Sequence, residues 1–359
     1  VKKVSDLKLM NFFKGLGTYF DKVQRMRKLG GMISDELLIS KEKVELAASI
    51  CKTDLTSDLV GEFPELQGIM GGYFAQSQGF DKDISLAITE QYLPIGLDSK
   101  IPKNPFSIVL SISDKLDTLV GFFGINQKPS SSKDPFALRR MALGIIRTLI
   151  ENKKELKIEN LINYTSSLFR DQKYNFENKL LQKELSNFLK ERFRYYLKEK
   201  EIRFDIIDAS MSSFSLDKLI STFEKAKSLN KIIDNQVGSD ITSCYKRASN
   251  ILDSEIKNID VELTNTTDPG IFKNDFEKNL FKKINKIRKY FSDVDKDEDY
   301  EQTLLVLADA KSEIFEFFDN VKVNEENETL RKNRLELINL LCKTFQNFTN
   351  FQLLKANNE

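Results

Sequence analysis

The 359-residue sequence predicts an all-α protein, and two features of its pattern indicate this fold class. Apolar residues recur at spacings of three and four through almost the whole chain, which places them on one face of a helix. No stretch alternates apolar and polar residues convincingly enough to predict a β-strand. Apolar residues make up 40% of the chain, which is enough for packed cores, and the length suits two or three domains.

The first third of the chain divides into helices and breaks. Apolar spacing predicts helices over 19–29 and 44–51. The proline and glycine within 62–68 indicate a kinked helix that packs closely on a neighbour. Three of the seven prolines fall within 94–105, which predicts a loop, and a second irregular stretch is expected at 124–132.

The middle of the chain contains one strong helix start. Asp134 followed by Pro135 predicts it, because a side-chain acceptor suits the N-cap and the missing N–H of proline costs nothing at the next position. The apolar residues of that helix continue to Ile150. Shorter helices with polar connectors are expected over 152–230, and the sequence NTTDPG at 265–270 predicts a turn.

The last part of the chain is also predicted to be helical. An apolar stripe runs along a helix over 276–291. The acidic run at 293–300 is expected to begin the next helix, because carboxylates favour the positive end of the helix dipole. Further helices are predicted over 304–317 and 330–341, and no internal repeat is apparent.

Histidine is absent from the chain, and this absence limits its chemistry. Without imidazole there is no His-based metal site, no Ser–His or Cys–His nucleophile and no His general base. Cys51, Cys244 and Cys342 form no CxxC pair and are expected to be buried thiols in a reducing cytoplasm. No apolar run is long enough to span a membrane. The chain begins without Met or an apolar leader, so we expect a fragment of a longer protein.

Several blocks of sequence are distinctive. Five of them lie in the first 150 residues: KTDLT at 52–56, VGEFPELQGIMG at 60–71, SDKLDTL at 113–119, GFFGI at 121–125 and SKDPFALRR at 132–140. Three more lie in the last 120 residues: KRASNIL at 246–252, FFDNVKV at 317–323 and LRKNRL at 330–335. In order and spacing these blocks resemble the glycyl-tRNA synthetase β-subunit family, over about residues 12–355.

This resemblance implies a domain organisation and a function. An HD-like helical domain is expected at 1–151, a helical connector at 152–230 and an anticodon-binding helical bundle, of the type shared with arginyl-tRNA synthetase, at 231–359. The family is a cytoplasmic α2β2 ligase that joins glycine to its tRNA. The resemblance implies that tRNA-Gly and the α subunit are the partners, with no DNA and no membrane. The holoenzyme uses ATP with Mg at the α subunit, and this chain is expected to hold no cofactor, no metal and no catalytic residue.

The sequence departs from true HD phosphohydrolases in one respect. Those enzymes hold a divalent metal with histidines and aspartates, whereas here Asp54 and either Asp114 or Asp117 stand without imidazole. Carboxylates alone do not reproduce that ligand set, which argues against a metal phosphohydrolase. A helical interaction scaffold without any role in RNA binding remains the second alternative.

With a net charge of only +1, any contact with RNA must come from local patches. Lys133, Arg139 and Arg140 are the candidates for the acceptor arm, because guanidinium groups match phosphate and helix N-termini favour anions. The alternative is that one arginine pairs with a nearby aspartate and holds the domain together. Two adjacent arginines on a helix point about 100° apart, so one of each kind is expected.

Two sets of residues are candidates for the anticodon. All glycine anticodons end in two cytosines, so a reader needs groups that pair with cytosine edges, together with cations for the backbone. The candidates are Lys246, Arg247, Asn250, Lys322, Arg331, Asn333 and Arg334. The alternative is that Asn250 and Arg334 satisfy buried backbone groups between helices.

Three further features have a structural interpretation that we prefer. The carboxylates of 62–68 have no nucleophile or metal ligand beside them. Lys278, Lys282, Lys286 and Lys289 share the face opposite the apolar stripe, but lysine is so common here that a solvated face is expected. Three phenylalanines could stack on bases, although core packing is expected for most of them: Phe315, Phe317 and Phe318.

Overall fold

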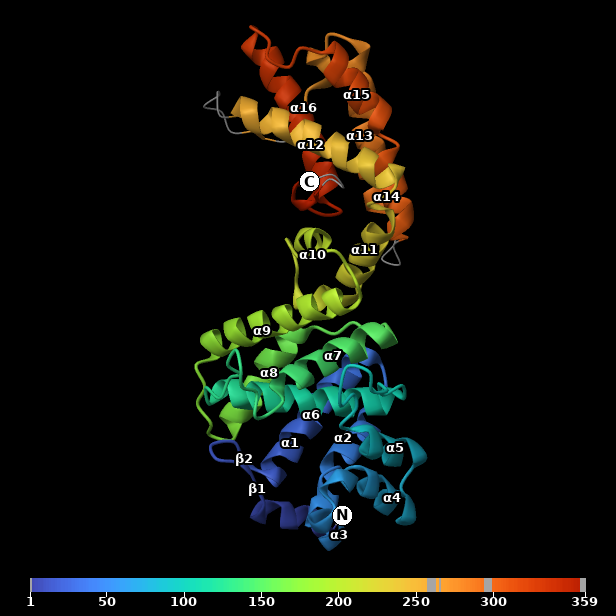
Figure 1. The fold of residues 1–359 in the computed structure, drawn as a ribbon. Helices are drawn as coiled ribbons and strands as arrows, with labels where there is room; N and C mark the ends of the chain where they lie inside the picture. The colour runs from blue at the N-terminus through green and yellow to red at the C-terminus, as the bar shows by residue number, and fades with distance from the viewer. Residues whose placement is uncertain (1, 257–262, 265, 294–298, 356–359) are drawn as a thin grey trace. The chain divides into compact units, whose positions relative to one another are not determined.

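The computed structural model describes residues 2–256, 263–264, 266–293 and 299–355. The fold is all-α, as predicted (Figure 1). Among the described residues, strand structure is confined to a short antiparallel pair, β1 (Asn11–Phe13) and β2 (Gly17–Thr18). The chain forms two compact units, residues 1–196 with 215–220 and residues 197–214 with 221–359. The three-part division stays a prediction, and its middle segment, 152–230, is divided between the two units.

The first unit is built around one buried helix, α6 (Pro105–Gly124), which packs against α1, α2, α5, α7 and α8 (Figure 1). Every residue of α6 from Ser107 to Phe123 is buried. The helices around it are α1 (Tyr19–Leu37), α2 (Lys41–Ile50), α3 (Asp58–Glu62), α4 (Ile69–Ser77), α5 (Lys82–Glu90), α7 (Leu138–Asn152), α8 (Ile158–Asp171) and most of α9 (Asn178–Glu199). Short 3-10 turns complete the unit: η1 (Lys2–Leu9), η2 (Thr53–Thr56), η3 (Pro64–Leu66) and η4 (Leu216–Lys218).

Side-chain caps determine where two helices of this core begin. Thr18 and Asp21 form a capping box at the start of α1, with the Asp21 N–H donating to Thr18 Oγ1 and the Thr18 N–H to Asp21 Oδ2. Asn104 caps α6 and Pro105 follows it, so the predicted loop at 94–105 ends where a proline suits the first helical turn. Helices α1 and α6 pack against each other, which brings their charged side chains together.

Three expectations about the first unit are wrong in detail. Helix α7 begins at Leu138, later than the Asp134–Pro135 start, because Ala137 adopts a left-handed conformation before it. Asp134 still caps the helix, with its carboxylate accepting from the backbone N–H groups of Leu138 and Arg139 at 2.9 Å each. Residues 62–68 do not form a kinked helix but separate α3 from α4, through a 3-10 turn. The segment 152–230 contains the 22-residue α9, so its helices are not uniformly short.

The second unit is a bundle in which α12 and α16 pack together and α13 contacts both α15 and α16. Its helices are α10 (Phe204–Ser210), most of α11 (Leu219–Ile232), α12 (Gln236–Ile256), α13 (Asp275–Asp293), α14 (Tyr300–Ala308), α15 (Lys311–Asn320) and α16 (Glu328–Gln346), with 3-10 turns η5 (Pro269–Ile271) and η6 (Phe351–Leu353). The predicted stripe of α13 is buried at Leu280, Ile284 and Ile287. Most of the acidic run at 293–300 lies outside the described residues.

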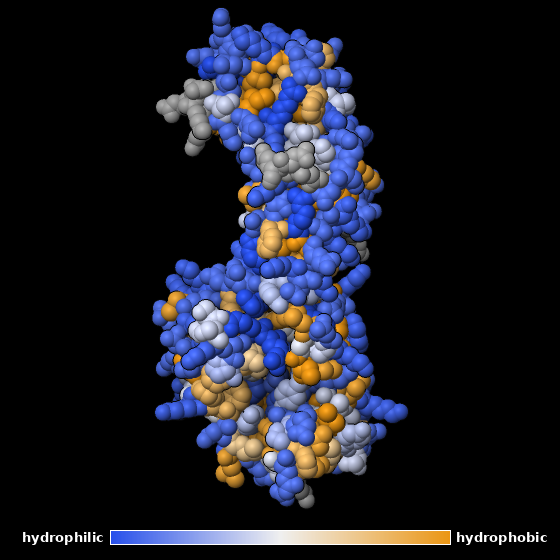
Figure 2. Space-filling view, viewed as in Figure 1, coloured by the Kyte–Doolittle hydropathy of each residue, from blue (hydrophilic) through white to orange (hydrophobic). Residues whose placement is uncertain are grey.

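None of the described helices is long and apolar enough to cross a membrane. On the face drawn in Figure 2, apolar patches are interspersed among hydrophilic side chains.

All three cysteines are buried with free thiols, and burial raises the pKa of each to about 12. We therefore expect the native protein to react with an aromatic disulfide reagent at pH 8 far more slowly than a free thiol does, because the thiolate is the reactive form. After denaturation all three thiols should react. Release of the chromophore before and after denaturation measures this, and a fast stoichiometric phase in the native protein would contradict it.

Candidate functional site

Two of the three carboxylates that the sequence offers as metal ligands, Asp114 and Asp117, are paired with buried cations. Asp117 of α6 lies between two residues of α1: Arg25 Nε donates to its Oδ1 at 2.6 Å and Lys22 Nζ to its Oδ2 at 3.1 Å. Asp114 Oδ1 lies 2.8 Å from Lys52 Nζ and 3.3 Å from Lys22 Nζ. Asp54 instead accepts from the backbone N–H of Gly68 and Gly71, at 2.6 and 3.2 Å, and so holds the turn that begins α4.

The charges of this cluster shift the acidity of its members. Burial alone would raise the pKa of Asp114, but the ammonium groups of Lys22 and Lys52 outweigh it and hold that pKa well below its usual value. Burial would lower the pKa of Lys52, and Asp114 reverses that effect and raises it. Burial lowers the pKa of Lys115 to about 7, although its Nζ lies 2.7 Å from the Leu93 carbonyl oxygen.

This arrangement is that of an ionic core. A divalent cation at Asp114 and Asp117 would have to displace ammonium groups that lie 2.8–3.3 Å from the same oxygens. Within the part of the chain that the structure describes, no group of three or more Cys, Asp or Glu side chains has the arrangement of a metal site. Removal of one partner from this cluster would leave a buried charge uncompensated, and Asp114 and Asp117 offer no open coordination position.

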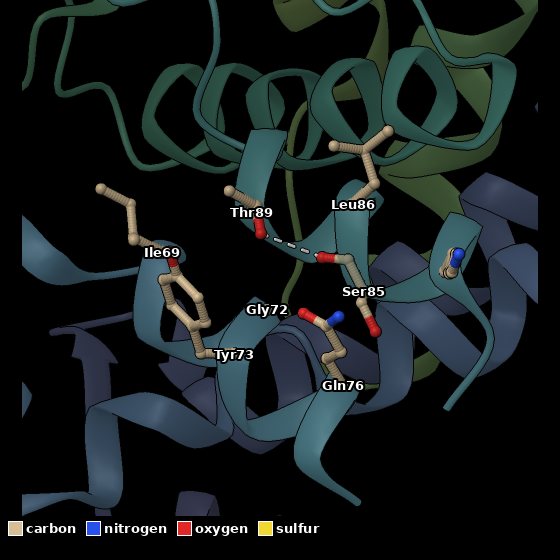
Figure 3. A pocket seen from close by; sticks show the side chains of 8 residues that line it. Ile69, Gly72, Tyr73, Gln76, Ser85, Leu86 and Thr89 are labelled. Carbon is tan, nitrogen blue, oxygen red and sulfur yellow. Dashed lines mark hydrogen bonds between the residues drawn. The ribbon is translucent and has the colours of Figure 1, made fainter. Parts of the chain in front are cut away.

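A hollow of about 280 Å³ lies between α4 and α5 (Figure 3). Its lining residues are Ile69, Gly72, Tyr73, Gln76, Lys82, Ser85, Leu86 and Thr89. Gly72 allows the two helices to approach, since a Cβ there would lie 1.9 Å from Thr89 Oγ1. The lining contains no carboxylate and no thiol, and the chain has no histidine that could activate the hydroxyl groups of Tyr73, Ser85 and Thr89.

The three residues predicted for the acceptor arm lie at the start of α7. Lys133 and Arg140 are exposed. Arg139 is half-buried, and its guanidinium donates to the backbone carbonyl oxygen of Ser130 in the preceding loop. Arg139 therefore holds the loop in place, whereas Lys133 and Arg140 project into solvent. The expected partner of one arginine was an aspartate, whereas Arg139 donates to a backbone carbonyl; an RNA contact by Arg140 stays a prediction.

The first candidate set for the anticodon lies on the outer side of α12. Asn250 is exposed, and Lys246 and Arg247 are half-buried. Arg247 Nη2 donates to Asp319 Oδ1 of α15 at 2.6 Å. The guanidinium carbon also lies 5.1 Å from the ring centroid of Phe315. The set thus combines cations, an amide and an aromatic ring, which are the groups that bind unpaired RNA.

The second candidate set divides between surface and interior. Asn333 is buried, with its side chain paired to both backbone groups of Asp268, at 2.8 and 3.0 Å. Arg334 is also buried; its Nε donates to Glu277 Oε1 and its Nη1 to the Lys322 carbonyl oxygen, both at 2.7 Å. These two side chains hold the bundle together, as the structural alternative for Arg334 required.

The other two members of that set remain accessible. Lys322 is exposed, and Arg331 is half-buried with a weak contact from its Nη1 to Asn324 Oδ1 at 3.4 Å. Lys322 lies in the loop that follows α15, and Arg331 lies in the first turn of α16. Arg334 of α16 donates to the Lys322 carbonyl oxygen and so fastens this loop to the helix. The loop begins directly after α15, two residues beyond Asp319.

The lysine-rich face of α13 is exposed at all four of its positions, as expected for a solvated face: Lys278, Lys282, Lys286 and Lys289. Lys278 pairs with Asp275 within the same helix, 3.1 Å away. Of the three phenylalanines considered for stacking, Phe317 is fully buried, whereas Phe315 and Phe318 are only partly buried.

Sequence reasoning missed Asp319, the partner of Arg247. The available signal is its position on α15, where Ile314 and Phe317 form the buried stripe. Asp319 falls off that stripe and faces outward, whereas the neighbouring Phe315 and Phe318 are partly buried beside it.

Comparisons with known proteins identify both parts of the chain. Residues 1–212 match the family model described as glycyl-tRNA synthetase beta subunit, and residues 241–356 match the model described as DALR anticodon binding domain. The glycine–tRNA ligase beta subunits of Rickettsia canadensis and Rickettsia africae are 37% and 36% identical over 98% of this chain and 50% of their own length.

The glycine–tRNA ligase beta subunit of Dinoroseobacter shibae is 32% identical over 94% of the chain and 50% of its own length. The chain therefore spans about half the length of the curated relatives it matches. The predicted resemblance is confirmed, and the chain belongs to the glycyl-tRNA synthetase β-subunit family.

Proposed function

We propose that this chain is the tRNA-binding part of a glycine–tRNA ligase β subunit. The observation that carries the proposal is the solvent-accessible group of half-buried Lys246 and Arg247 and exposed Asn250, with Arg247 beside two partly buried aromatic rings. It lies in the part of the chain that matches an anticodon-binding domain. Cations hold RNA phosphates, and aromatic rings stack on unpaired bases. Lys322 and Arg331 are further accessible candidates in the same domain, whereas the buried Asn333 and Arg334 are not accessible to RNA.

The first unit would hold the acceptor arm at the start of α7. Lys133 and Arg140 project into solvent there, and the Asp134 cap fixes the geometry of the turn. An A-form stem is bound through its phosphates and hydroxyl groups rather than its base sequence, which suits two flexible cations. The acceptor arm supplies affinity, and the anticodon supplies selection.

The bond-forming steps belong to another subunit in this proposal. The α subunit would bind ATP with Mg and glycine, within an α2β2 assembly in the cytoplasm, and this chain would present the tRNA to it. The ionic core of the first unit supports the division of labour, because its carboxylates hold ammonium groups rather than an open metal site. A metal phosphohydrolase would need those oxygens to be accessible.

The test is filter binding of glycine tRNA and of a non-cognate tRNA to the complete ligase, over a range of salt concentrations. We expect preferential binding of glycine tRNA. The substitution Arg140→Ala should weaken binding about threefold to tenfold and make the salt slope shallower by roughly 0.7–0.9. Arg170→Ala on α8 removes an equally exposed arginine and is the matched control.

Two outcomes would contradict the proposal. Equal affinity for the two tRNAs would favour a helical scaffold without a role in tRNA recognition. Hydrolysis of a phosphodiester by this chain alone would favour the phosphohydrolase. If Arg140→Ala and Arg170→Ala give the same affinity and slope, the acceptor-arm assignment is wrong while the anticodon assignment stands.

A further inference from the structure

On the surface of the second unit, an arginine and an aspartate stand side by side above two aromatic rings. Arg247 Nη2 lies 2.6 Å from Asp319 Oδ1. The guanidinium carbon lies 5.1 Å from the ring centroid of Phe315 and 5.2 Å from that of Phe318. Both charged side chains reach solvent, since Arg247 is 33% exposed and Asp319 is 60% exposed.

Stability alone is a weak explanation for this pair. Exposed ion pairs contribute about 0–1 kcal/mol. The same two helices are already joined by Lys311 and Asp240, 2.8 Å apart. Among the described residues, Asp319 Oδ2 has no hydrogen-bond partner. The pair therefore presents an unused acceptor next to guanidinium donors, at the edge of a partly exposed aromatic surface.

These groups are complementary to one edge of cytosine. Cytosine carries an N4 amino donor next to the acceptors N3 and O2, so a carboxylate can accept from N4 while a guanidinium donates to N3 or O2. Uracil places the acceptor O4 where cytosine has its amino group, and a carboxylate repels it. The ring of either base can stack on an aromatic side chain or on the guanidinium plane.

We infer that Asp319, positioned by Arg247, selects cytosine over uracil at one of the two cytosines that every glycine anticodon contains. This inference rests on the proposed function, because it requires that the anticodon reaches this surface. Both residues lie in the part of the chain that matches an anticodon-binding domain. Asp319 makes the base-specific contact, and Arg247 supplies the neighbouring donors and the stacking surface.

The experiment compares the complete ligase with its Asp319→Asn variant, using glycine tRNA and two transcripts in which one anticodon cytosine is replaced by uracil. The readouts are Kd and kcat/KM for glycylation. The unmodified ligase should prefer cytosine roughly tenfold to a hundredfold at each position. In Asp319→Asn the preference at one position should fall to about threefold or less, because a carboxamide can accept from cytosine N4 or donate to uracil O4.

Asp309→Asn is the matched control, since Asp309 is also an exposed aspartate in an ion pair, 2.9 Å from Lys283. It should retain the full preference at both positions. Arg247→Lys keeps the positive charge but loses the planar guanidinium group, and it should weaken binding of the unaltered tRNA. Thermal unfolding of each variant is the measurement that checks whether its fold is kept.

The outcomes separate the two proposals. If Asp319→Asn keeps the full preference for cytosine at both positions, the inference is overturned and the proposed function stands. If the unmodified ligase binds glycine tRNA no better than the uracil transcripts and a non-cognate tRNA, the proposed function itself fails.

Discussion

Replacing Asp117 with alanine is expected to lower the free energy of unfolding of the first unit by about 3–5 kcal/mol. Asp117 is completely buried and neutralises two buried cations, Arg25 and Lys22. Its removal leaves a guanidinium that lies over the ring of Phe169 and an ammonium group without their common counterion. The desolvation of the guanidinium is then uncompensated, and Lys22 keeps only Asp114, whose Oδ1 lies 3.3 Å away; this explains the size of the effect.

Urea unfolding is monitored by hydrogen exchange of peptides from α1 and α6. This measures the loss of unfolding free energy in the first unit separately from that in the second. The control is Asp171→Ala, which removes an exposed carboxylate 3.9 Å from Lys28 and should cost less than about 1 kcal/mol. Asp117→Asn keeps the shape of the side chain but not its charge, so its loss of unfolding free energy should lie between those of Asp117→Ala and Asp171→Ala. If Asp117→Ala were as stable as Asp171→Ala, the ionic core would not be what holds α1 to α6.

Much of the fold could be predicted because helix periodicity and capping are local properties. The stripe of α13 is buried at Leu280, Ile284 and Ile287, as its spacing indicates. The loop at 94–105 lies between α5 and α6. The start of α7 was predicted too early, because the conformation of Ala137 depends on the loop before it and not on the Asp–Pro signal.

The roles of charged side chains were harder to predict, because their partners lie far away in the chain. Arg25 and Asp117 are 92 residues apart, and Arg334 and Glu277 are 57 apart. A local signal does exist for such residues. Arg334 falls in line with the apolar residues of α16, and a charged residue on a buried stripe must be paired. Residues off the stripes, such as Asn250, stay available to a ligand.

Replacing Glu277 with alanine should destabilise the second unit to a similar extent, by about 3–5 kcal/mol, because it leaves the buried Arg334 without its buried charge partner and with only the partly exposed Glu325. Glu277 also accepts from the backbone N–H groups of Lys273 and Asn274, at 2.6 and 3.1 Å. Asn274 Oδ1 in turn accepts from the Glu277 N–H at 3.0 Å, so the two residues form a reciprocal cap at the start of α13. Loss of that cap adds about 1 kcal/mol.

Glu325→Ala is the matched control, since Glu325 pairs with the same arginine at 3.2 Å but is 34% exposed. Its cost should be about 1 kcal/mol or less. Urea unfolding, monitored by hydrogen exchange of peptides from α13 and α16, measures the loss of unfolding free energy in each variant.

Because Arg334 is buried and paired inside the bundle, Arg334→Ala should affect tRNA binding only through the stability of the second unit. If the side chain acts only inside the bundle, tRNA affinity and its salt slope stay unchanged at temperatures where the variant remains folded, and binding disappears only as the second unit unfolds. A shallower salt slope in the folded variant would instead mean that Arg334 leaves its buried position and reaches the RNA, because only a lost phosphate contact changes the number of ions released.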